Sequence, residues 1–217
     1  DGSTIPEETR GRDFRVDGQA YRVVSMRDIT ERKRAEAELR QRLAERDAVA
    51  TVSSVLRAAE TLEEMLPRLL DETLAVLNTD AGSILLYDAA ANDLRQVAGR
   101  GWFGPLASIP HRPDEGIAGL VVTTGEVFLS TEFAADARTR AAIRSMVPAS
   151  RGGTCMPLQS SRQVVGGLFV AVAVPRQLTA DEVHLLTTLA EIAGSAIHRM
   201  RLHEQTERSL RRMAALR

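Results

Sequence analysis

The chain has 217 residues, 44% of them hydrophobic and 26% charged, proportions that are usual for a folded domain. Its formal net charge of -1 gives no indication of a nucleic-acid or membrane-surface partner. The single cysteine, Cys155, excludes an internal disulfide and a Cys-x-x-Cys metal cluster, and no apolar run reaches the ~20 residues of a membrane-spanning helix.

Residues 1–29 predict a β-hairpin. Apolar and polar residues alternate on both sides of Asp17-Gly18, and this dipeptide favours a tight turn because glycine accepts a positive φ. Two strands alone are marginally stable in water. We therefore expect the hairpin to be the edge of a sheet whose other strands lie outside this sequence, in a longer cytoplasmic protein.

A long helix is predicted over about 31–59, because no Gly or Pro occurs before Pro67. Thr30 is expected to be its N-cap, with the hydroxyl accepting a hydrogen bond from an amide of the first turn. Four apolar residues lie near heptad spacing, with polar residues between them: Ala35, Leu39, Val49 and Leu56. Two interpretations stay open, a parallel pairing with the same helix of a second chain and a single solvated connecting helix.

Alternating strands and helices are predicted from residue 61 to residue 174. An amphipathic helix covers 61–77, with a start or kink near Pro67. Strands are expected at 81–87, 94–98, 127–130, 154–158 and 164–174, and helices at 116–124 and 135–146. The Gly- and Pro-rich residues 99–115 predict a long loop.

The last helix is predicted to begin at a capping box formed by Thr179 and Glu182. It carries two apolar stripes. The first is expected to cover the sheet and comprises Val183, Leu186, Ala190, Ala193, Ile197 and Met200. The second comprises Leu185, Leu189, Ile192 and Ala196 and continues past His203 to Leu210 and Met213. Because a monomer needs only one stripe, we expect the second to face a partner helix in a homodimer.

Six segments together resemble a GAF domain and cover about residues 48–203. They are ILLYD at 84–88, VAGRG at 97–101, DEGIAGLVVTTGE at 114–126, CMPL at 155–158, VVGGLFVAV at 164–172 and the final helix from Leu178 to Leu202. The resemblance implies an α+β fold, an antiparallel sheet flanked by helices with a ligand cavity roofed by the loop and short helices. It also implies a sensory or regulatory role and a parallel dimer.

The segment DFRVDGQAYRVVSMRDITERKRAEAEL resembles the last hairpin of a PAS domain with its Asp-Ile-Thr signature. The signature falls on Asp28, Ile29 and Thr30. By this resemblance, Asp28 is expected to hold an arginine or a backbone amide, and Ile29 to dock on the sheet. The expected organisation is a PAS remnant at 1–29, a signalling helix at 30–47, a GAF domain at 48–203, and at 204–217 the start of a helix to a downstream module.

Several ligand classes of GAF domains match this chain poorly. The cyclic-nucleotide type carries an Asn/Lys/Phe/Asp/Glu set, whereas the only lysine here is Lys33, in the linker. The bilin type has Cys-His and Asp-Ile-Pro, whereas this chain has Cys155-Met156 and Ser108-Ile109-Pro110. Methionine sulfoxide reductases built on this fold need a second, resolving cysteine, which is absent.

The histidines on the last helix are weak candidates for a phosphorylation site or a haem ligand. His203-Glu204 resembles a kinase phosphoacceptor box but lacks the proline that follows it, so a solvated or interface histidine is expected. His184 and His198 leave a haem-binding or other chromophore-binding sensor as an alternative. No cofactor is required by the sequence.

The expected cavity roof contains Trp102, Phe103, His111 and Arg112 in the Gly/Pro-rich loop. Trp102 and Phe103 act either as a hydrophobic lid or in direct ligand contact, and both interpretations stay open. Arg112, Ser130 and Thr154 are candidate polar anchors. Cys155, next to Thr154 on the same predicted strand, is a further candidate for the ligand site, although a free cysteine is usually a small buried residue.

The sequence therefore predicts a non-catalytic sensory and dimerising segment of a bacterial signal-transduction protein. It is expected to bind an unidentified small molecule or to relay a signal from the PAS domain to an output domain. The alternative is a structural dimerisation or spacer module whose cavity is filled by its own side chains. An enzyme is not expected, because no paired acid/base or thiol groups are recognisable.

Overall fold

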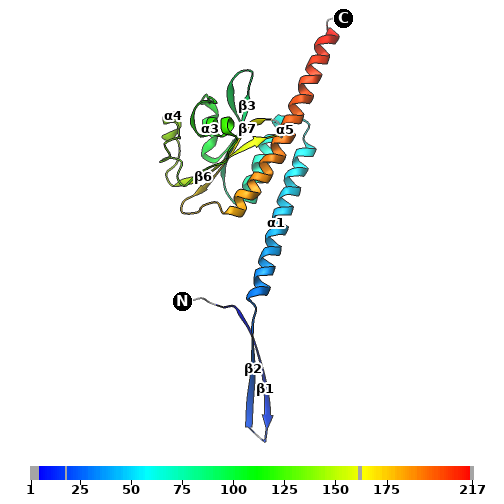
Figure 1. Ribbon diagram of the computed structural model, residues 1–217, viewed down its shortest axis with the longest axis vertical. Coiled ribbons are helices and arrows are strands. Elements are labelled where there is room, and N and C mark those ends of the chain that lie inside the picture. The colour runs from blue at the N-terminus through cyan, green and yellow to red at the C-terminus, as the bar shows by residue number, and fades with distance from the viewer. Residues whose placement is uncertain (1–4, 18, 161–162, 216–217) are drawn as a thin grey trace. The chain divides into compact units, whose positions relative to one another are not determined.

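The computed structural model describes residues 5–17, 19–160 and 163–215, and it divides the chain into two compact units, Asp1–Asp47 and Ala48–Arg217. The first unit contains an antiparallel hairpin of β1 (Glu7–Val16) and β2 (Gln19–Asp28), drawn in blue in Figure 1. Asp17 in the turn has a φ of 50°, as the Asp-Gly signal predicts. Val23, Val24 and Met26 are exposed, as expected of strands without a covering layer.

Helix α1 (Thr30–Ala58) follows β2 directly and continues from the first unit into the second. Its first amide is bound by Asp28, because the Thr30 N–H donates to Asp28 Oδ1 at 2.8 Å. Hydrogen bonds from the Thr30 hydroxyl and amide lower the pKa of Asp28. Thr30 was expected to be the N-cap; this was wrong, because Thr30 is already helical and the carboxylate two residues earlier supplies the cap. Asp28 does hold a backbone amide, as expected.

Ile29 marks the joint between the hairpin and the helix. Its side chain is buried, its amide donates to the Pro6 carbonyl at 3.0 Å, and its carbonyl accepts from the Lys33 amide. Docking of the Ile29 side chain on a complete PAS sheet stays a prediction.

The second unit is built on a five-stranded antiparallel sheet with the order β4-β3-β7-β6-β5. Its strands are β3 (Ala81–Asp88), β4 (Asp93–Arg100), β5 (Phe128–Ser130), β6 (Arg151–Gln159) and β7 (Val164–Ala173). β3, β6 and β7 are almost wholly buried, because helices cover both faces of the sheet, and this explains their continuous apolar runs.

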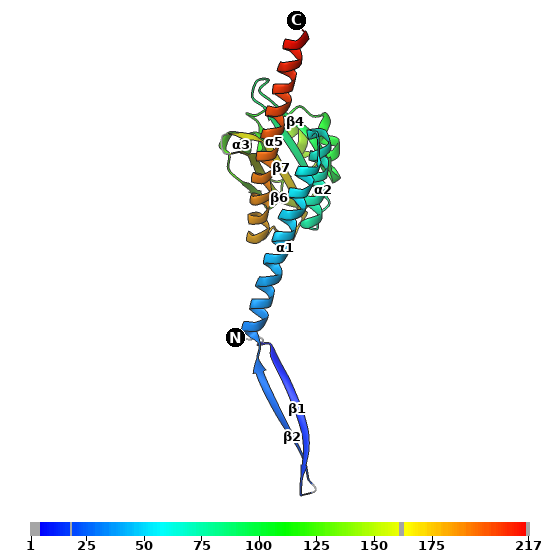
Figure 2. The same cartoon turned by 90° about the vertical axis from the view of Figure 1, so that its right-hand side faces the viewer.

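Helices α2 (Leu62–Val76) and α5 (Ala180–Ala215) cover one face of this sheet, onto which Figure 2 looks. Thr61 caps α2 by accepting from the Glu64 amide, and α2 runs through Pro67. The predicted capping box of α5 is confirmed, because the Thr179 amide donates to Glu182 Oε2 and the Glu182 amide donates to Thr179 Oγ1.

The opposite face carries η1 (Gly101–Ser108), a 3-10 helix, together with α3 (Gly116–Thr124) and α4 (Ala141–Arg144). Two expectations are corrected here. The predicted loop at 99–115 contains the end of β4 and η1. The predicted helix at 135–146 shrinks to four residues, because the Arg144 guanidinium binds the carbonyls of Ala134, Asp136 and Thr139 in an irregular segment.

The second stripe of α5 was expected to face a partner helix, and this was wrong for most of its length. Leu189 and Ala196 are 0% and 3% exposed and belong to the core of the same chain, against which Leu185 also packs. Ile192 is partly buried. Both stripes are covered because α5 lies on β6 and β7 on one side and against α2 on the other.

The end of α1 is covered in a similar way. Val52 is fully buried in that core, and Val49 and Leu56, which were expected to form a dimer seam, pack against it. Leu39, by contrast, is exposed. No helix in the ranges that the structure describes is long and apolar enough to cross a membrane.

Candidate functional site

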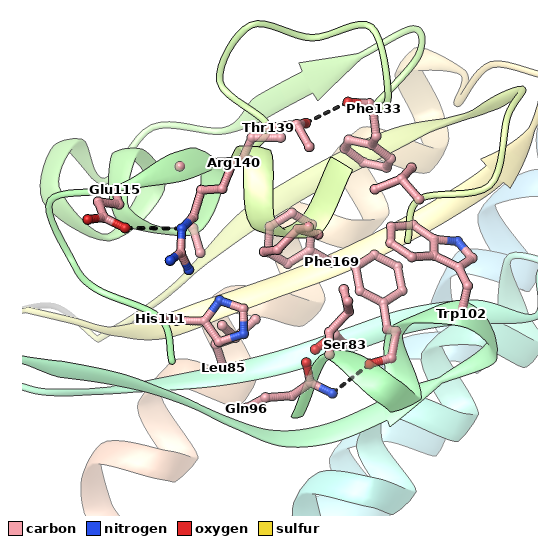
Figure 3. A pocket seen from close by; sticks show the side chains of 17 residues that line it. Ser83, Leu85, Gln96, Trp102, His111, Glu115, Phe133, Thr139, Arg140 and Phe169 are labelled. Carbon is pink, nitrogen blue, oxygen red and sulfur yellow. Dashed lines mark hydrogen bonds and ion pairs between the residues drawn. The ribbon is translucent and has the colours of Figure 1, made fainter. Parts of the chain in front are cut away.

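A cavity of about 60 Å³ lies between the sheet and the layer formed by η1, α3 and the segment around α4 (Figure 3). Seventeen residues line it, from β3, β4 and β7 below and from the covering segments above. One lining residue, Glu115, has a side chain that is 45% exposed, so the lining extends to the surface of the domain.

Aromatic rings form one wall of this cavity. Trp102 stacks on Phe103 with ring centroids 3.8 Å apart, and Phe103 and Phe133 each contact Phe169 at centroid distances of 5.6 and 6.2 Å. The indole nitrogen of Trp102 is buried without a hydrogen-bond partner, and Figure 3 shows it on the edge of the ring turned away from His111. This wall provides a stacking surface for a flat or apolar group.

His111 faces this wall from the loop after η1. Its backbone is fixed to β4, because the Leu94 amide donates to the His111 carbonyl at 3.2 Å. The side chain is 8% exposed and points into the cavity in Figure 3, and its Nε2 has no hydrogen-bond partner among the described residues. Burial, with the nearby Arg140 charge, lowers the pKa of His111, although a backbone hydrogen bond with Leu106 opposes this. The imidazole is therefore neutral at pH 7.

Arg140 and Glu115 form an ion pair at one end of the cavity, with Arg140 Nε 3.1 Å from Glu115 Oε2. The Arg140 guanidinium also donates to the Pro110 carbonyl at 2.7 Å. Its alkyl chain passes over Gly116, which has a φ of +71°, and a Cβ at that position would lie 2.8 Å from Arg140 Cγ. Glycine at the start of α3 therefore makes room for this arginine.

Other polar side chains of the lining are used within the protein. Gln96 Nε2 donates to the Phe103 carbonyl at 2.9 Å, Ser83 Oγ to the Ala98 carbonyl at 3.1 Å, and Thr139 Oγ1 to the Phe133 carbonyl. The Gln96 bond holds η1 in position, the Thr139 bond holds the segment before α4, and the Ser83 bond joins β3 to β4. The lining thus contains two buried polar atoms without a bond to any described residue, Trp102 Nε1 and His111 Nε2, and of these the His111 ring points into the cavity in Figure 3.

The structure brings three of the predicted ligand-contact residues, Trp102, Phe103 and His111, into the cavity lining. Arg112 does not join them, because it is exposed and pairs with Asp114 at 3.6 Å. Ser130 also lies outside the lining, where its hydroxyl donates to Asp136 Oδ2 at 3.4 Å.

The two predicted residues on β6 are structural. Thr154 is buried and its hydroxyl donates to the Phe128 carbonyl at 2.8 Å. Cys155 is fully buried, and burial raises the pKa of its thiol. Because a protonated thiol is a poor nucleophile, Cys155 is an apolar core residue.

Sequence reasoning missed Phe133, Phe169, Gln96, Glu115 and Arg140 as lining residues. One signal was available for the aromatic wall. The chain has five Phe and one Trp, and all of them except Phe14 lie between residues 102 and 169, which suggests a shared cluster.

The helical histidines lie outside the cavity lining. His198 contacts Gln163 at 3.2 Å, and His203 pairs with Glu207 at 3.2 Å on the exposed surface of α5. No group of three or more His, Cys, Asp or Glu side chains in the described part of the chain is arranged to hold a metal ion.

Comparison with known proteins identifies residues 59–198 as a GAF domain. No curated protein matches the chain. Similar solved structures include the GAF domain of a phosphoenolpyruvate-protein phosphotransferase from Coxiella burnetii, with 17% identity and a TM-score of 0.68 over 75% of this chain and 98% of that chain.

Two further structures resemble it. The free methionine-R-sulfoxide reductase from Neisseria meningitidis in complex with its substrate has 18% identity and a TM-score of 0.62 over 73% of this chain and 91% of that chain. Residues 122 to 287 of a methyl-accepting chemotaxis protein have 23% identity and a TM-score of 0.56 over 72% and 99%. At these identities the structures show a common fold, and the matched residues 59–198 span more than half of the chain. The chain belongs to the GAF domain family.

Proposed function

We propose that the second unit is a non-catalytic sensory domain that binds a small molecule in the cavity beside His111 and Trp102. The observation that carries this proposal is His111 Nε2, a polar atom that is buried, faces the cavity and lacks a partner. Leaving such an atom unpaired costs about 1–3 kcal/mol, which a ligand with a matching group recovers on binding. The similar domains of a phosphotransferase and a chemotaxis protein agree with a regulatory role.

Strand β7 offers a direct route from the cavity to α5. Phe169 lies on the cavity side of β7, and its neighbours Leu168 and Val170 belong to the core that contains α5. A displacement of β7 on ligand binding therefore reaches both faces of the sheet. Such coupling requires that the ligand interacts differently with two states of the domain.

The first unit is proposed to deliver a second input. The cap that Asp28 forms on α1 ties the hairpin to that helix, and the end of α1 lies in the core with Val52. By resemblance, the hairpin is the tail of a PAS domain in a bacterial signalling protein. This origin and a cytoplasmic location stay predictions.

We propose that α5 transmits the conformational change out of the domain, and that it does so in a homodimer. Beyond Met200 the helix continues, and Leu210 and Met213 are each 59% exposed at the three-residue spacing of a helical seam. Because the first part of α5 is buried in its own domain, this later part and the exposed Leu39 on α1 are the remaining candidates for contact with a second chain.

An enzymatic role is not proposed. The similar fold of a methionine sulfoxide reductase raises that possibility, but Cys155 is the only cysteine, is fully buried, and lies outside the cavity lining. A thiol-based reduction would need an accessible thiolate.

Native mass spectrometry of the purified chain tests this proposal, because it reports stoichiometry and retained ligand together. We expect a dimer with one small molecule per protomer. Ala118→Leu fills the cavity, since Ala118 lines it and is buried, and should abolish the retained mass. Ala107→Leu adds the same volume at an exposed position of η1 outside the lining and should leave the retained mass unchanged.

The same spectra test the dimer. Leu210→Glu should shift the population to monomer with the small molecule retained, whereas Ser209→Glu, on the neighbouring exposed position, should not. A bare chain mass for the wild-type protein would favour the structural spacer whose cavity is closed by its own side chains. A monomer at every concentration would contradict the dimer.

A further inference from the structure

The cavity also indicates which kind of ligand it takes, an inference that rests on the proposed function. We infer that the ligand is uncharged and donates a hydrogen bond, through an N–H or O–H group, to Nε2 of His111, with a flat or apolar body against the aromatic wall. The wall consists of Trp102, Phe103, Phe133 and Phe169.

The inference that the ligand carries a hydrogen-bond donor rests on the protonation state of His111. Burial keeps the imidazole neutral, so one ring nitrogen carries a proton and the other is an acceptor. The Leu106 backbone lies close enough to the ring to favour a proton on the nearby nitrogen, and Nε2 has no partner among the described residues, so we assign the proton to Nδ1, on the side of the Leu106 carbonyl. Nε2 is then an acceptor that faces the cavity, and its complement is a donor.

The inference that the ligand is uncharged rests on Arg140, the positively charged residue of the cavity lining. The Arg140 guanidinium already forms an ion pair with Glu115 at 3.1 Å and donates to the Pro110 carbonyl at 2.7 Å. A carboxylate or phosphate would have to displace Glu115 and would also face the lone pair of Nε2. A cationic ligand would meet the Arg140 guanidinium. A neutral ligand avoids both costs.

The size of the cavity limits the group beside His111. An apolar cavity of about 150 Å³ holds benzene, whereas this one is about 60 Å³. The buried part of the ligand is therefore smaller than a benzene ring, and any larger part extends toward solvent.

Pyrrole and furan test the donor directly, because the two five-membered rings have nearly the same shape but only pyrrole has an N–H. Trp102 is the only tryptophan and lines the cavity, so its fluorescence reports binding without a label. We expect the wild-type chain to bind pyrrole about tenfold more tightly than furan, the value of one hydrogen bond to a buried acceptor. Acetate should bind more weakly than pyrrole.

Substitution of His111 separates the donor preference from binding itself. His111→Phe keeps an aromatic ring without the acceptor and should reduce the pyrrole-to-furan ratio to about one. His184→Phe, on an exposed position of α5 outside the lining, should keep the wild-type ratio. The wild-type ratio alone remains decisive if His111→Phe does not fold.

Each result has a distinct meaning. Equal affinities of the wild-type chain for pyrrole and furan would overturn the donor inference while leaving a ligand site in place. Tighter binding of acetate than of pyrrole would overturn the uncharged ligand. No response to any of the three probes would contradict the ligand site itself, and with it the proposed function.

Discussion

At the scale of single residues, buried polar side chains of the second unit mostly serve the backbone. Ser83, Gln96, Thr139 and Thr154 each donate to a main-chain carbonyl, so their polarity is satisfied within the fold. This explains why Thr154, predicted as a ligand anchor, is structural. Residue type alone does not distinguish a buried hydroxyl that binds the backbone from one that faces a cavity.

Replacing Thr154 with Val should therefore affect stability and leave the ligand site intact. The substitution removes the hydrogen bond to the Phe128 carbonyl, which joins β6 to the short edge strand β5. We expect a loss of about 1–2 kcal/mol in the free energy of unfolding, measured by urea denaturation. Retention of the small molecule in native spectra should not change.

Thr124→Val provides the matched control. The Thr124 hydroxyl also donates to a carbonyl, that of Leu120, but at an exposed position of α3. Its loss should change the unfolding free energy by no more than about 0.5 kcal/mol. Equal losses of unfolding free energy for the two substitutions would mean that the buried hydrogen bond to the Phe128 carbonyl does not contribute to stability.

At the scale of elements, periodicity predicted the helices and strands that pack through regular faces. α2, α3, α5 and the strands of the sheet were found close to their expected bounds. The errors fall at 101–108 and 135–146, where side chains such as Gln96, Thr139 and Arg144 bind main-chain carbonyls. Those partners are distant or irregularly spaced in the sequence, so no periodic pattern signals them.

The packing of α5 on β6 explains why its second stripe was assigned to a partner helix. Gly194 allows a close approach, because a Cβ at this position would lie 2.4 Å from both the backbone N and O of Gln159. This approach draws the neighbouring Leu189 and Ala196 into the core of the domain. A helix pattern shows that two faces are apolar but not which one a second chain covers.

Gly194→Ala should destabilise the domain, although alanine is the better helix former by about 1 kcal/mol. The added methyl group meets main-chain atoms of β6 that cannot rotate away, so α5 has to shift. We expect a net loss of roughly 1–3 kcal/mol in unfolding free energy, seen as a lower midpoint in thermal or urea denaturation.

Gly104→Ala is the appropriate comparison, because a Cβ at position 104 would meet nothing within 4 Å. This variant should unfold within about 0.5 kcal/mol of the wild-type protein. A tolerated Gly194→Ala would show that the contact between α5 and β6 adjusts freely, which would weaken the argument for a rigid connection between the sheet and α5.

At the scale of the whole molecule, the succession of helices and strands along the chain, the antiparallel sheet and the presence of a covered cavity could be predicted from motifs and their resemblance to GAF domains. The order of the strands within the sheet came only from the structure. The cavity could be predicted only in part. Its lining comes from positions between Ser83 and Phe169, and the Arg140–Glu115 pair and the contact of Phe133 with Phe169 arise only when separate segments fold over the sheet. Trp102, Phe103 and His111 were recognisable because they share one Gly/Pro-rich segment.

A crystal structure of the chain as purified is the sharpest test of a ligand site in the cavity beside His111. We expect electron density for a connected group of several non-hydrogen atoms against the aromatic wall, with one atom about 2.7–3.2 Å from His111 Nε2. Isolated water peaks, or a cavity closed by Trp102 or Phe133 packed against His111, would contradict it.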